Sequence, residues 1–429
     1  MNYGLPKRIE QKLYLWSLLY FAAILPFQFQ VLSPTIGILG VSVAWFFSFR
    51  FKEKFALFIK SPAALTAVAL VIIECLGLIY TTNHKEGEKD VVMKMSIFVF
   101  PLIFSGIAHW PQNWTRKTLL TLAFSTALSS LYLLLNSCLF YIENNTWLLH
   151  QDFVKYPRIG VHYFALYNIL SFFSLLYFFP KGRWLKWLYT ICLLVFVTSL
   201  MFAAARVQLL IFGLGLIYYF FWRFRDKPFL KVLLAQISAI LILFLITLLI
   251  PFTRQRITDS YHELKAYEGN DKTYQRFQTN HRVFIWSYGV QVVKEHIPFG
   301  TGTGAENDYL YEKLKTEDAE FWDGTGTYTL SKHKYNYHNE YLQHLAALGL
   351  PGILALLAVL ITPFFSCRLN FISILFLGMI LLSFITESIL QRQAGTLFFA
   401  FFYALFFCIK NPILLENKTG HKNITLQKF

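Results

Sequence analysis

Several ionisable side chains lie inside or beside long apolar stretches of this chain, and the most isolated of them is Arg206. A charge at membrane depth costs roughly a few kcal/mol unless it is paired, hydrated or used. Arg206 lies in SLMFAAARVQLLIFGLG, between two apolar stretches with almost no connector. A guanidinium can bind two phosphate oxygens at once, so Arg206 is a candidate for holding a phosphate group. The alternative is an interfacial arginine that reaches the lipid headgroups.

Two further residues could take part in the same chemistry. Arg282 opens RVFIWSYGVQVVKEH, whose apolar spacing predicts a helix over 282–296. His338 lies in YNYHNEYLQHLAALGLPG, where a long apolar stretch begins. An imidazole is well matched to taking a proton near neutral pH, which makes His338 a candidate general base. The alternatives are a solvated loop charge at Arg282 and a polar group at a helix start at His338.

Three other ionisable residues are weaker candidates for the same site. Lys94 begins an apolar stretch, His162 lies at the start of another, and Glu387 ends a third. A lysine that extends to the headgroups and a capped helix end are the simpler interpretations of Lys94 and Glu387. The sequence predicts no metal site, because His338 and His344 are six residues apart and lie on different helical faces.

The elements that must position these residues are membrane helices. The chain is 56% hydrophobic and only 15% charged, and its mean hydropathy is +0.47. Soluble domains carry about 25% charged residues, so we expect an all-α membrane protein with about 12 transmembrane helices. The apolar stretches of spanning length lie near 13–30, 33–49, 62–80, 92–108, 118–141, 160–179, 184–203, 207–222, 230–251, 339–363, 370–386 and 395–409.

Lysine and arginine are distributed unequally over the connectors between these stretches. Alternate connectors differ in basic residues by roughly three to one, which places both termini in the cytoplasm. The long segment 252–337 then forms one large periplasmic loop inserted in a single polytopic domain of residues 1–429. The same distribution explains the net charge of +15 without nucleic acid as a partner. The first apolar stretch has no small-residue cleavage site after it, so we expect a retained helix.

Two other patterns are less informative about chemistry. The run PFGTGTG over 298–304 predicts a turn, but it lacks the following GK[ST] and flanking strand of a phosphate-binding loop. The five cysteines fall in or beside apolar stretches, which indicates buried apolar side chains and no disulfide framework.

Over roughly residues 60–410 the chain resembles the O-antigen ligase and polymerase superfamily of bacterial envelope glycosyltransferases. Four segments carry the resemblance in order: FAAARVQLLIFG, HRVFIWSYGVQVVKEHIPFGTGTG, YHNEYLQHLAALGLPG and TESILQRQAGTLFFAFFYAL. The second has the family's Arg-x3-Trp helix and Pro-x-Gly-x-Gly turn, and the third has its His-Asn opening. Family members often have Ser and Gly around the isolated arginine, where this chain has AAARVQ.

The resemblance implies a metal-independent, inverting transfer of a glycan from undecaprenyl pyrophosphate to an acceptor hydroxyl at the periplasmic face of the inner membrane. It implies that Arg206 and Arg282 hold the donor's pyrophosphate and that His338 activates the acceptor. No cofactor is implied. Stabilising the departing phosphates is the main electrostatic task, and arginines can perform it without a cation.

Three functions fit these features to different degrees. We favour a ligase that acts on lipid A–core, because one dominant outer loop lies late in the chain. The close alternative is a polymerase that joins lipid-linked repeat units. A lipid-linked oligosaccharide flippase or other transporter fits less well, because we find no internal repeat and no polar groups near the bilayer midplane.

Overall fold

The computed structural model describes most of the chain. The described residues are 6–27, 32–155, 159–228, 230, 233, 234, 237, 281–316, 320–322, 327–329 and 334–409. The ninth apolar stretch, near 230–251, and the first part of the predicted outer loop lie outside them, so neither prediction is tested.

Helices dominate the first half of the chain. In order they are α1 (Lys7–Ile24), η1 (Leu25–Phe27), α2 (Leu32–Phe47), α3 (Phe51–Ile59), α4 (Pro62–Gly77), α5 (His84–Ser105), α6 (Gln112–Asn144), α7 (Val161–Tyr177), α8 (Arg183–Ala203) and α9 (Arg206–Phe224). Local sequence explains several of the ends. Pro62 opens α4 at a position where its missing N–H is not needed. The side chain of Asn83, which precedes α5, accepts a hydrogen bond from the Glu86 N–H.

The second half combines helices with one small hairpin. Its elements are α13 (His281–His296), α14 (Glu306–Thr316), β1 (Glu320–Trp322), β2 (Thr327–Thr329), α15 (Glu340–Ser366), α16 (Phe371–Thr386), η3 (Ile389–Gln391), α17 (Gln393–Tyr403) and the π-helical turn Ala404–Cys408. The two strands are antiparallel, with Phe321 opposite Tyr328. Helix α13 confirms the helix expected over 282–296.

The expected membrane helices agree largely with those observed. Each apolar stretch that falls within the described residues coincides with a helix. Among the described residues, four helices are long and apolar enough to cross a membrane: Asn113–Asn144, Arg183–Ala203, Arg206–Phe224 and Glu340–Ser366. Four further apolar helices are shorter: Pro62–Gly77, Val161–Tyr177, Phe371–Thr386 and Gln393–Cys408. The fold is therefore that of a helical membrane protein, and the count of twelve spans stays a prediction.

Helix α3 was not anticipated from the sequence. It follows α2 after a bend of 115°, and the two residues at the bend, Phe49 and Arg50, have positive φ values of 52° and 29°. Its sequence FKEKFALFI lies between the apolar stretches near 33–49 and 62–80, where the sequence predicts a connector. It forms a separate short helix instead.

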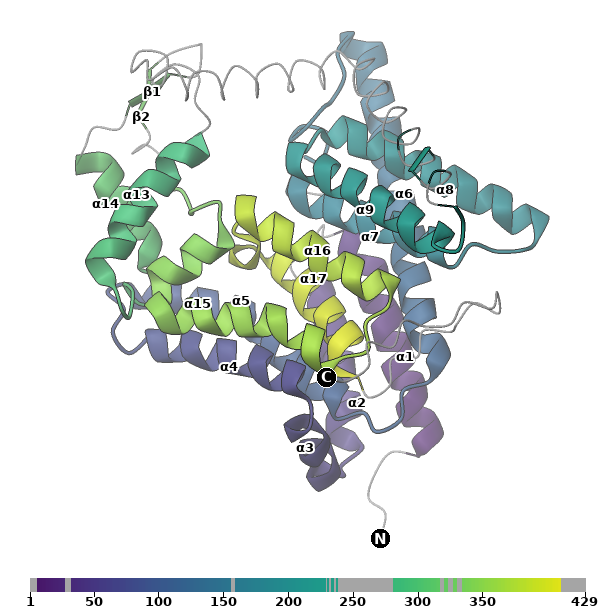
Figure 1. Cartoon of the computed structure of the whole chain (residues 1–429), viewed down its shortest axis with the longest axis horizontal. Coiled ribbons are helices and arrows are strands. Elements are labelled where there is room, and N and C mark those ends of the chain that lie inside the picture. The colour runs from purple at the N-terminus through teal and green to yellow at the C-terminus, as the bar shows by residue number, and fades with distance from the viewer. Residues whose placement is uncertain are drawn as a thin grey trace.

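Helix α17 lies at the centre of the core. Every residue from Ala394 to Tyr403 is buried. The Phe401 ring stacks on Phe21 of α1 at 4.5 Å between ring centroids, and the Tyr403 hydroxyl donates to the Val359 carbonyl at 2.9 Å. Helices from both ends of the sequence therefore share one core, with α16 and α17 in the middle of the molecule (Figure 1).

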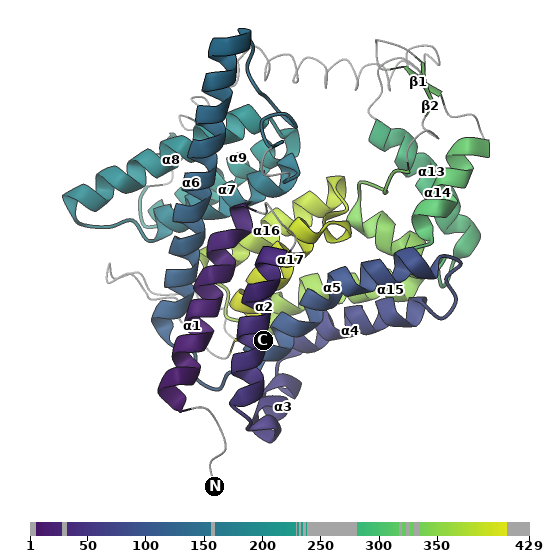
Figure 2. The same ribbon diagram turned by 180° about the vertical axis from the view of Figure 1, so that it is seen from behind.

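The two ends of the molecule differ. Helices α13 and α14 and the hairpin β1–β2 lie at one end, whereas the N-terminus and α3 lie at the other (Figures 1 and 2).

The cysteines follow the expectation only in part. All five are free; Cys192 and Cys408 are buried, and Cys367 is partly buried. Cys75 and Cys138 are exposed on the surfaces of α4 and α6, so the prediction of buried side chains is wrong for these two.

Candidate functional site

Three basic side chains converge on one buried carboxylate, that of Glu387. The His162 Nε2 atom lies 2.8 Å from Glu387 Oε1, and the His338 Nδ1 atom lies 3.3 Å from Oε2. The Arg282 Nη2 atom donates to Oε1 and lies 3.5 Å from His162 Nε2. The Glu387 side chain is 7% exposed, whereas that of His338 is 30% exposed. We call these four residues the Glu387 cluster.

Four helix ends bring the Glu387 cluster together. His162 is the second residue of α7, Arg282 is the second residue of α13, and His338 comes just before α15. Glu387 caps the C-terminus of α16. Helix N-termini carry a partial positive charge, so the starts of α7, α13 and α15 add to the field around this carboxylate.

The backbone at His338 is held in an uncommon conformation. His338 has a φ of 44°, in the left-handed region that non-glycine residues rarely adopt. Its neighbours fix this geometry. The Asn339 side chain accepts from the Leu342 N–H at 2.9 Å, and the Asn339 N–H donates to Ser388 Oγ at 3.2 Å. The imidazole is therefore positioned by the residue that caps α15 and by the residue after Glu387.

The surroundings of Glu387 keep it ionised. Burial alone raises the pKa of a carboxyl group. Here the hydrogen bonds with His162 and His338 and the charges of His162 and Arg282 outweigh burial, so the pKa of Glu387 lies well below its usual value of 4.5. A carboxylate that faces His338 Nδ1 favours the tautomer with the proton on that nitrogen. In that tautomer Nε2 carries the lone pair that a general base needs.

Arg206 is the first residue of α9, close in sequence to a residue that contacts the cluster. Gln208, two positions later, places its Oε1 atom 3.1 Å from His162 Nδ1. Gln208 is fully buried, and its Nε2 atom lacks a hydrogen-bond partner among the described residues. The preceding Ala204 has a φ of 43°, the conformation that glycine adopts without strain. The turn before Arg206 therefore keeps a glycine-like shape although the sequence reads AAARVQ.

Lys94 lies outside the Glu387 cluster. Its Nζ atom is 2.6 Å from Glu74 Oε1, and the two side chains are 3% and 1% exposed. His344 joins the same group: its Nε2 is 3.3 Å from Glu74 Oε1, and its Nδ1 is 3.1 Å from Glu340 Oε1. Lys94 is thus enclosed and paired, not extended to lipid headgroups, and its geometry does not favour a substrate-binding role. We call Glu74, Lys94, Glu340 and His344 the Glu74 cluster.

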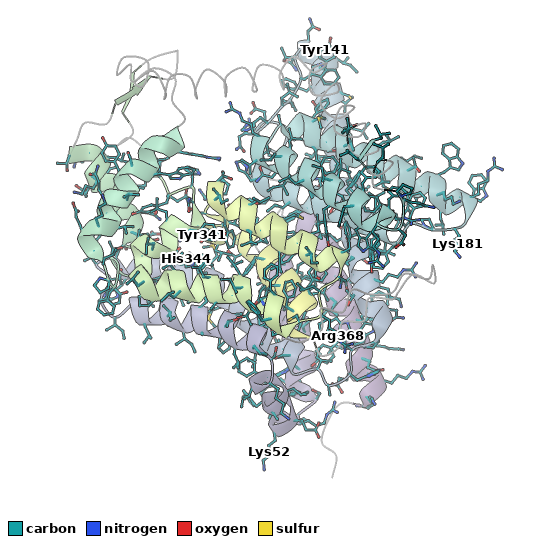
Figure 3. All side chains as sticks on the ribbon, viewed as in Figure 1. Lys52, Tyr141, Lys181, Tyr341, His344 and Arg368 are labelled. Atoms are coloured by element: carbon teal, nitrogen blue, oxygen red, sulfur yellow. The ribbon has the colours of Figure 1, made fainter. Side chains whose placement is uncertain are left out.

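Hydrogen bonds link the two clusters. Glu340 Oε2 accepts from the Leu390 N–H at 2.6 Å, and Gln343 Oε1 accepts from Ser388 Oγ at 3.2 Å. Both donors belong to the short segment that follows Glu387. Figure 3 shows His344 on α15 in the interior of the molecule. The Glu74 cluster therefore holds, through α15, the segment that carries Glu387.

Sequence reasoning missed Glu74, Glu340 and His344 as members of a charged group. The signal for Glu74 was present: it is a lone carboxylate in the apolar run LVIIECLG, and such a residue needs a partner. Glu340 and His344 are also spaced at i and i+4 on α15.

The glycine-rich turn after α13 packs against other helices. Gly300, Gly302 and Gly304 have φ values of 77°, 92° and 86°. The four N–H groups from Gly300 to Thr303 donate to the carbonyls of His296, Ala346, Ala347 and Gly77, in that order. The Thr303 hydroxyl donates to the Glu74 carbonyl at 2.7 Å. The turn thus fixes α13, α15 and α4 to one another.

Within the part of the chain that the structure describes, no three His, Cys, Asp or Glu side chains are grouped in a way that could hold a metal ion.

The fold and the cluster define a helical membrane protein with basic side chains gathered around a buried carboxylate. Residues 191–357 match the family model described as O-antigen ligase, so this part of the chain is similar to that family. The matched segment contains Arg206, Arg282 and His338. A comparison with curated proteins gave no match.

Proposed function

We propose that this protein is an O-antigen ligase-like glycosyltransferase of the bacterial inner membrane. It transfers a glycan from undecaprenyl pyrophosphate to a hydroxyl of lipid A–core at the periplasmic face. The observation that supports this proposal most strongly is the approach of Arg282 and His338 to Glu387. Two of these residues lie within the segment that matches the family.

In the proposed reaction, His338 is the general base. Its Nε2 atom takes the proton of the acceptor hydroxyl as the oxygen attacks the anomeric carbon of the donor sugar. The bond between that carbon and the pyrophosphate oxygen breaks, and undecaprenyl pyrophosphate leaves with the electron pair. Attack from the face opposite the leaving group inverts the anomeric configuration. Glu387 stabilises the imidazolium that forms, because its carboxylate faces Nδ1.

Arg206 and Arg282 are proposed to bind the pyrophosphate. Its negative charge grows as the bond breaks, and cationic donors placed beforehand stabilise it. Arginine has five N–H donors, so contact of the Arg282 Nη2 atom with Glu387 is compatible with a phosphate on the same guanidinium. No metal or other cofactor has a role in this scheme.

The proposed membrane arrangement follows from the charge distribution. In this arrangement the Glu387 cluster lies at the periplasmic face. The arrangement has twelve spans, cytoplasmic termini and a periplasmic loop over 252–337. The Glu74 cluster lies toward the same face, because Glu74 is near the end of α4 and His344 is near the start of α15. Polar groups on one side of the membrane favour an enzyme over an alternating-access transporter.

The test uses the purified protein in detergent with an undecaprenyl-pyrophosphate-linked oligosaccharide, and products are analysed by size. A ligase leaves the donor intact until lipid A–core is added and then consumes it. Longer lipid-linked glycans without lipid A–core would show a polymerase, in which the acceptor hydroxyl belongs to a second lipid-linked unit. The family match is compatible with both activities.

A further inference from the structure

A second feature suited to binding lies at the end of the molecule that carries the N-terminus. It is a cavity of about 140 Å³. Its lining residues are Lys7, Glu10, Gln11, Tyr14, Arg50, Glu53, Lys54, Gly106, Ile107, Ala108, His109 and Trp114. Nothing in the proposed transfer reaction uses it.

The cavity and the glycine-rich turn lie at opposite ends of α5. Helix α5 begins beside that turn, since Gly87 lies against Thr303, and it ends at Ser105, just before the cavity. Its 22 residues span roughly 33 Å at 1.5 Å per residue. In the proposed topology the apolar stretch 92–108 crosses the membrane toward the cytoplasm, so the cavity, which is lined by residues 106–109, lies at the cytoplasmic surface.

The charges around the cavity are mostly positive. Four basic residues line it and only two acidic ones. Arg50 pairs with Glu10 at 3.2 Å, and Lys54 is buried, with its ammonium group 4.5 Å from the centre of the Trp45 ring. These contacts leave Arg50 partly exposed, at 51% of its side chain.

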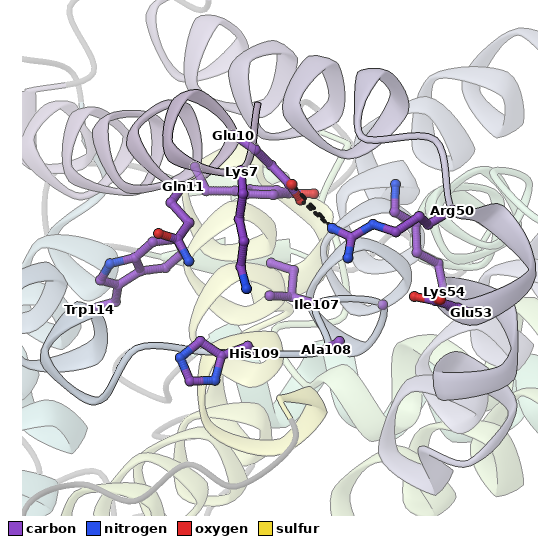
Figure 4. A pocket seen from close by; sticks show the side chains of 12 residues that line it. Lys7, Glu10, Gln11, Arg50, Glu53, Lys54, Ile107, Ala108, His109 and Trp114 are labelled. Atoms are coloured by element: carbon purple, nitrogen blue, oxygen red, sulfur yellow. Dashed lines mark hydrogen bonds and ion pairs between the residues drawn. The ribbon is translucent and has the colours of Figure 1, made fainter. Parts of the chain in front are cut away.

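Lys7 and His109 supply the remaining positive or donor groups. Both are exposed, and neither has a carboxylate partner among the residues that the structure describes. Figure 4 shows them approaching the cavity from different elements, with the Arg50–Glu10 pair on another side. An imidazole keeps at least one N–H donor in either protonation state.

Local backbone geometry adds to the attraction for an anion. Lys7 opens α1, Arg50 caps α3, and Trp114 lies in the first turn of α6. Three helix N-termini therefore border the cavity, and each carries a partial positive charge. The left-handed residues Phe49 and Arg50 produce the bend that brings α3 to this position. Backbone strain of this kind is kept where surrounding contacts require it.

Exposed aromatic side chains lie next to this charged cavity. Phe46, Phe47, Phe49 and Phe55 are all exposed and belong to α2, α3 and the bend between them. A ligand with a charged headgroup and apolar chains could contact both the cavity and the exposed phenylalanine side chains. Basic pockets between helices at the cytoplasmic surface recognise anionic lipid headgroups on these grounds.

We propose that this cavity binds the phosphate headgroup of an anionic phospholipid of the cytoplasmic leaflet. Lys7 and His109 donate to the phosphate oxygens, Arg50 contributes its charge, and the phenylalanines of α2 and α3 contact the acyl chains. The bound lipid ties α1, α3 and the start of α6 together. This binding does not depend on the transfer activity proposed above.

The experiment measures the thermal unfolding midpoint of the full chain in a neutral detergent. Phosphatidylglycerol, phosphatidylcholine and inorganic phosphate are added separately at equal concentrations. The test variant is Lys7→Gln with His109→Gln. The matched control is Lys52→Gln, which removes an exposed charge from α3 at a residue that does not line the cavity. Figure 3 shows Lys52 projecting outward at this end of the molecule.

We expect phosphatidylglycerol to raise the midpoint of the wild type and of Lys52→Gln by several degrees, and phosphatidylcholine to have little effect. The double variant should lose at least half of that increase. An equal increase in the double variant would overturn the proposal. An increase of the same size with inorganic phosphate alone would also overturn it, because the ligand would then be a soluble phosphate. Gel filtration of each variant checks that folding is intact.

Discussion

The Glu387 cluster and the Glu74 cluster contain similar side chains but differ in exposure. In each, a buried carboxylate binds a cationic side chain and a histidine. The His338 side chain is 30% exposed and that of Arg282 is 20% exposed, whereas Lys94 and His344 are nearly enclosed. A molecule outside the protein can contact the first group but not the second. Accessibility of the basic partners, more than the presence of charge, therefore distinguishes a candidate site from a structural ion pair in this molecule.

The largest expected effect is on the exposed histidine. Replacing His338 by alanine removes the proposed base, and general-base catalysis contributes typically about 10²–10⁴-fold. We expect the rate of glycan transfer to fall by that factor while the unfolding midpoint changes little. The control is His344→Gln, which alters the enclosed histidine. This variant should lower the unfolding midpoint but change the rate of glycan transfer by the folded protein only slightly. Full transfer activity in His338→Ala would contradict the assignment of His338 as the general base.

Glu387→Gln should affect both rate and stability. The neutral amide no longer favours the proton on His338 Nδ1, so we expect about a tenfold or greater loss of transfer, in line with partner residues of catalytic or metal-bound histidines. Because the folded pKa of Glu387 lies below 4.5, its carboxylate stabilises the fold above that pH, and this stabilisation is lost as the pH falls.

The unfolding midpoints of wild type and Glu387→Gln, measured from pH 7 to pH 3, check the stability part of this prediction. The difference between them should be largest near neutral pH and should narrow in acid. A difference that grows in acid would contradict the assignment of Glu387 as an ionised group.

Single changes in the Glu74 cluster should destabilise the protein without a direct effect on chemistry. Removing one partner of a buried ion pair costs about 3–5 kcal/mol, because the other charge is left uncompensated. We expect Glu74→Gln and Lys94→Met to lower the unfolding midpoint strongly, and the double variant to regain much of the loss. If the double variant were as unstable as the sum of both changes, the pair would not be coupled.

Glu306 should give the smallest effect. Burial and the negative charge of Asp90 raise its pKa to about 7, and its Oε1 accepts from Gln343 Nε2 at 2.8 Å. A raised pKa means that the folded state holds the proton more tightly, so this stabilisation is complete below pH 4.5 and is lost as the pH rises to about 7. As the pH rises from 5 to 8, the unfolding midpoint of the wild type should fall. The midpoint of Glu306→Gln should fall by a few degrees less over the same range. Equal pH profiles would contradict the raised pKa.

The sequence predicted the helices better than the contacts between them. Long apolar stretches are recognisable because the bilayer sets their length, and those within the described residues coincide with helices. The sequence did not predict helix α3, because charged residues interrupt the apolar residues of this short segment. Arg282 and His338 could be proposed from residue type and position. From the sequence, Glu387 is only a secondary candidate, because a capped helix end is its simpler interpretation. Its contact with His338 spans 49 residues, and no local pattern encodes that contact.

Lys94 shows why the remainder could not be predicted. Its neighbours VVMKMSIFVFP suggest a lysine near a membrane surface. Its environment is set instead by Glu74 on another helix and by His344 from the second half of the chain. Pairing of buried charges depends on how helices pack, and local sequence carries little of that information.

The most direct test locates the donor on the protein. A lipid-linked oligosaccharide with a photoreactive group beside the pyrophosphate is bound to the purified protein, cross-linked by light and mapped by mass spectrometry. The labelled peptides should contain Arg206, Arg282 or His338, and this labelling should be lost when unlabelled donor competes. Specific labelling of the α4 and α5 peptides around Glu74 and Lys94, with none at the Glu387 cluster, would contradict this prediction.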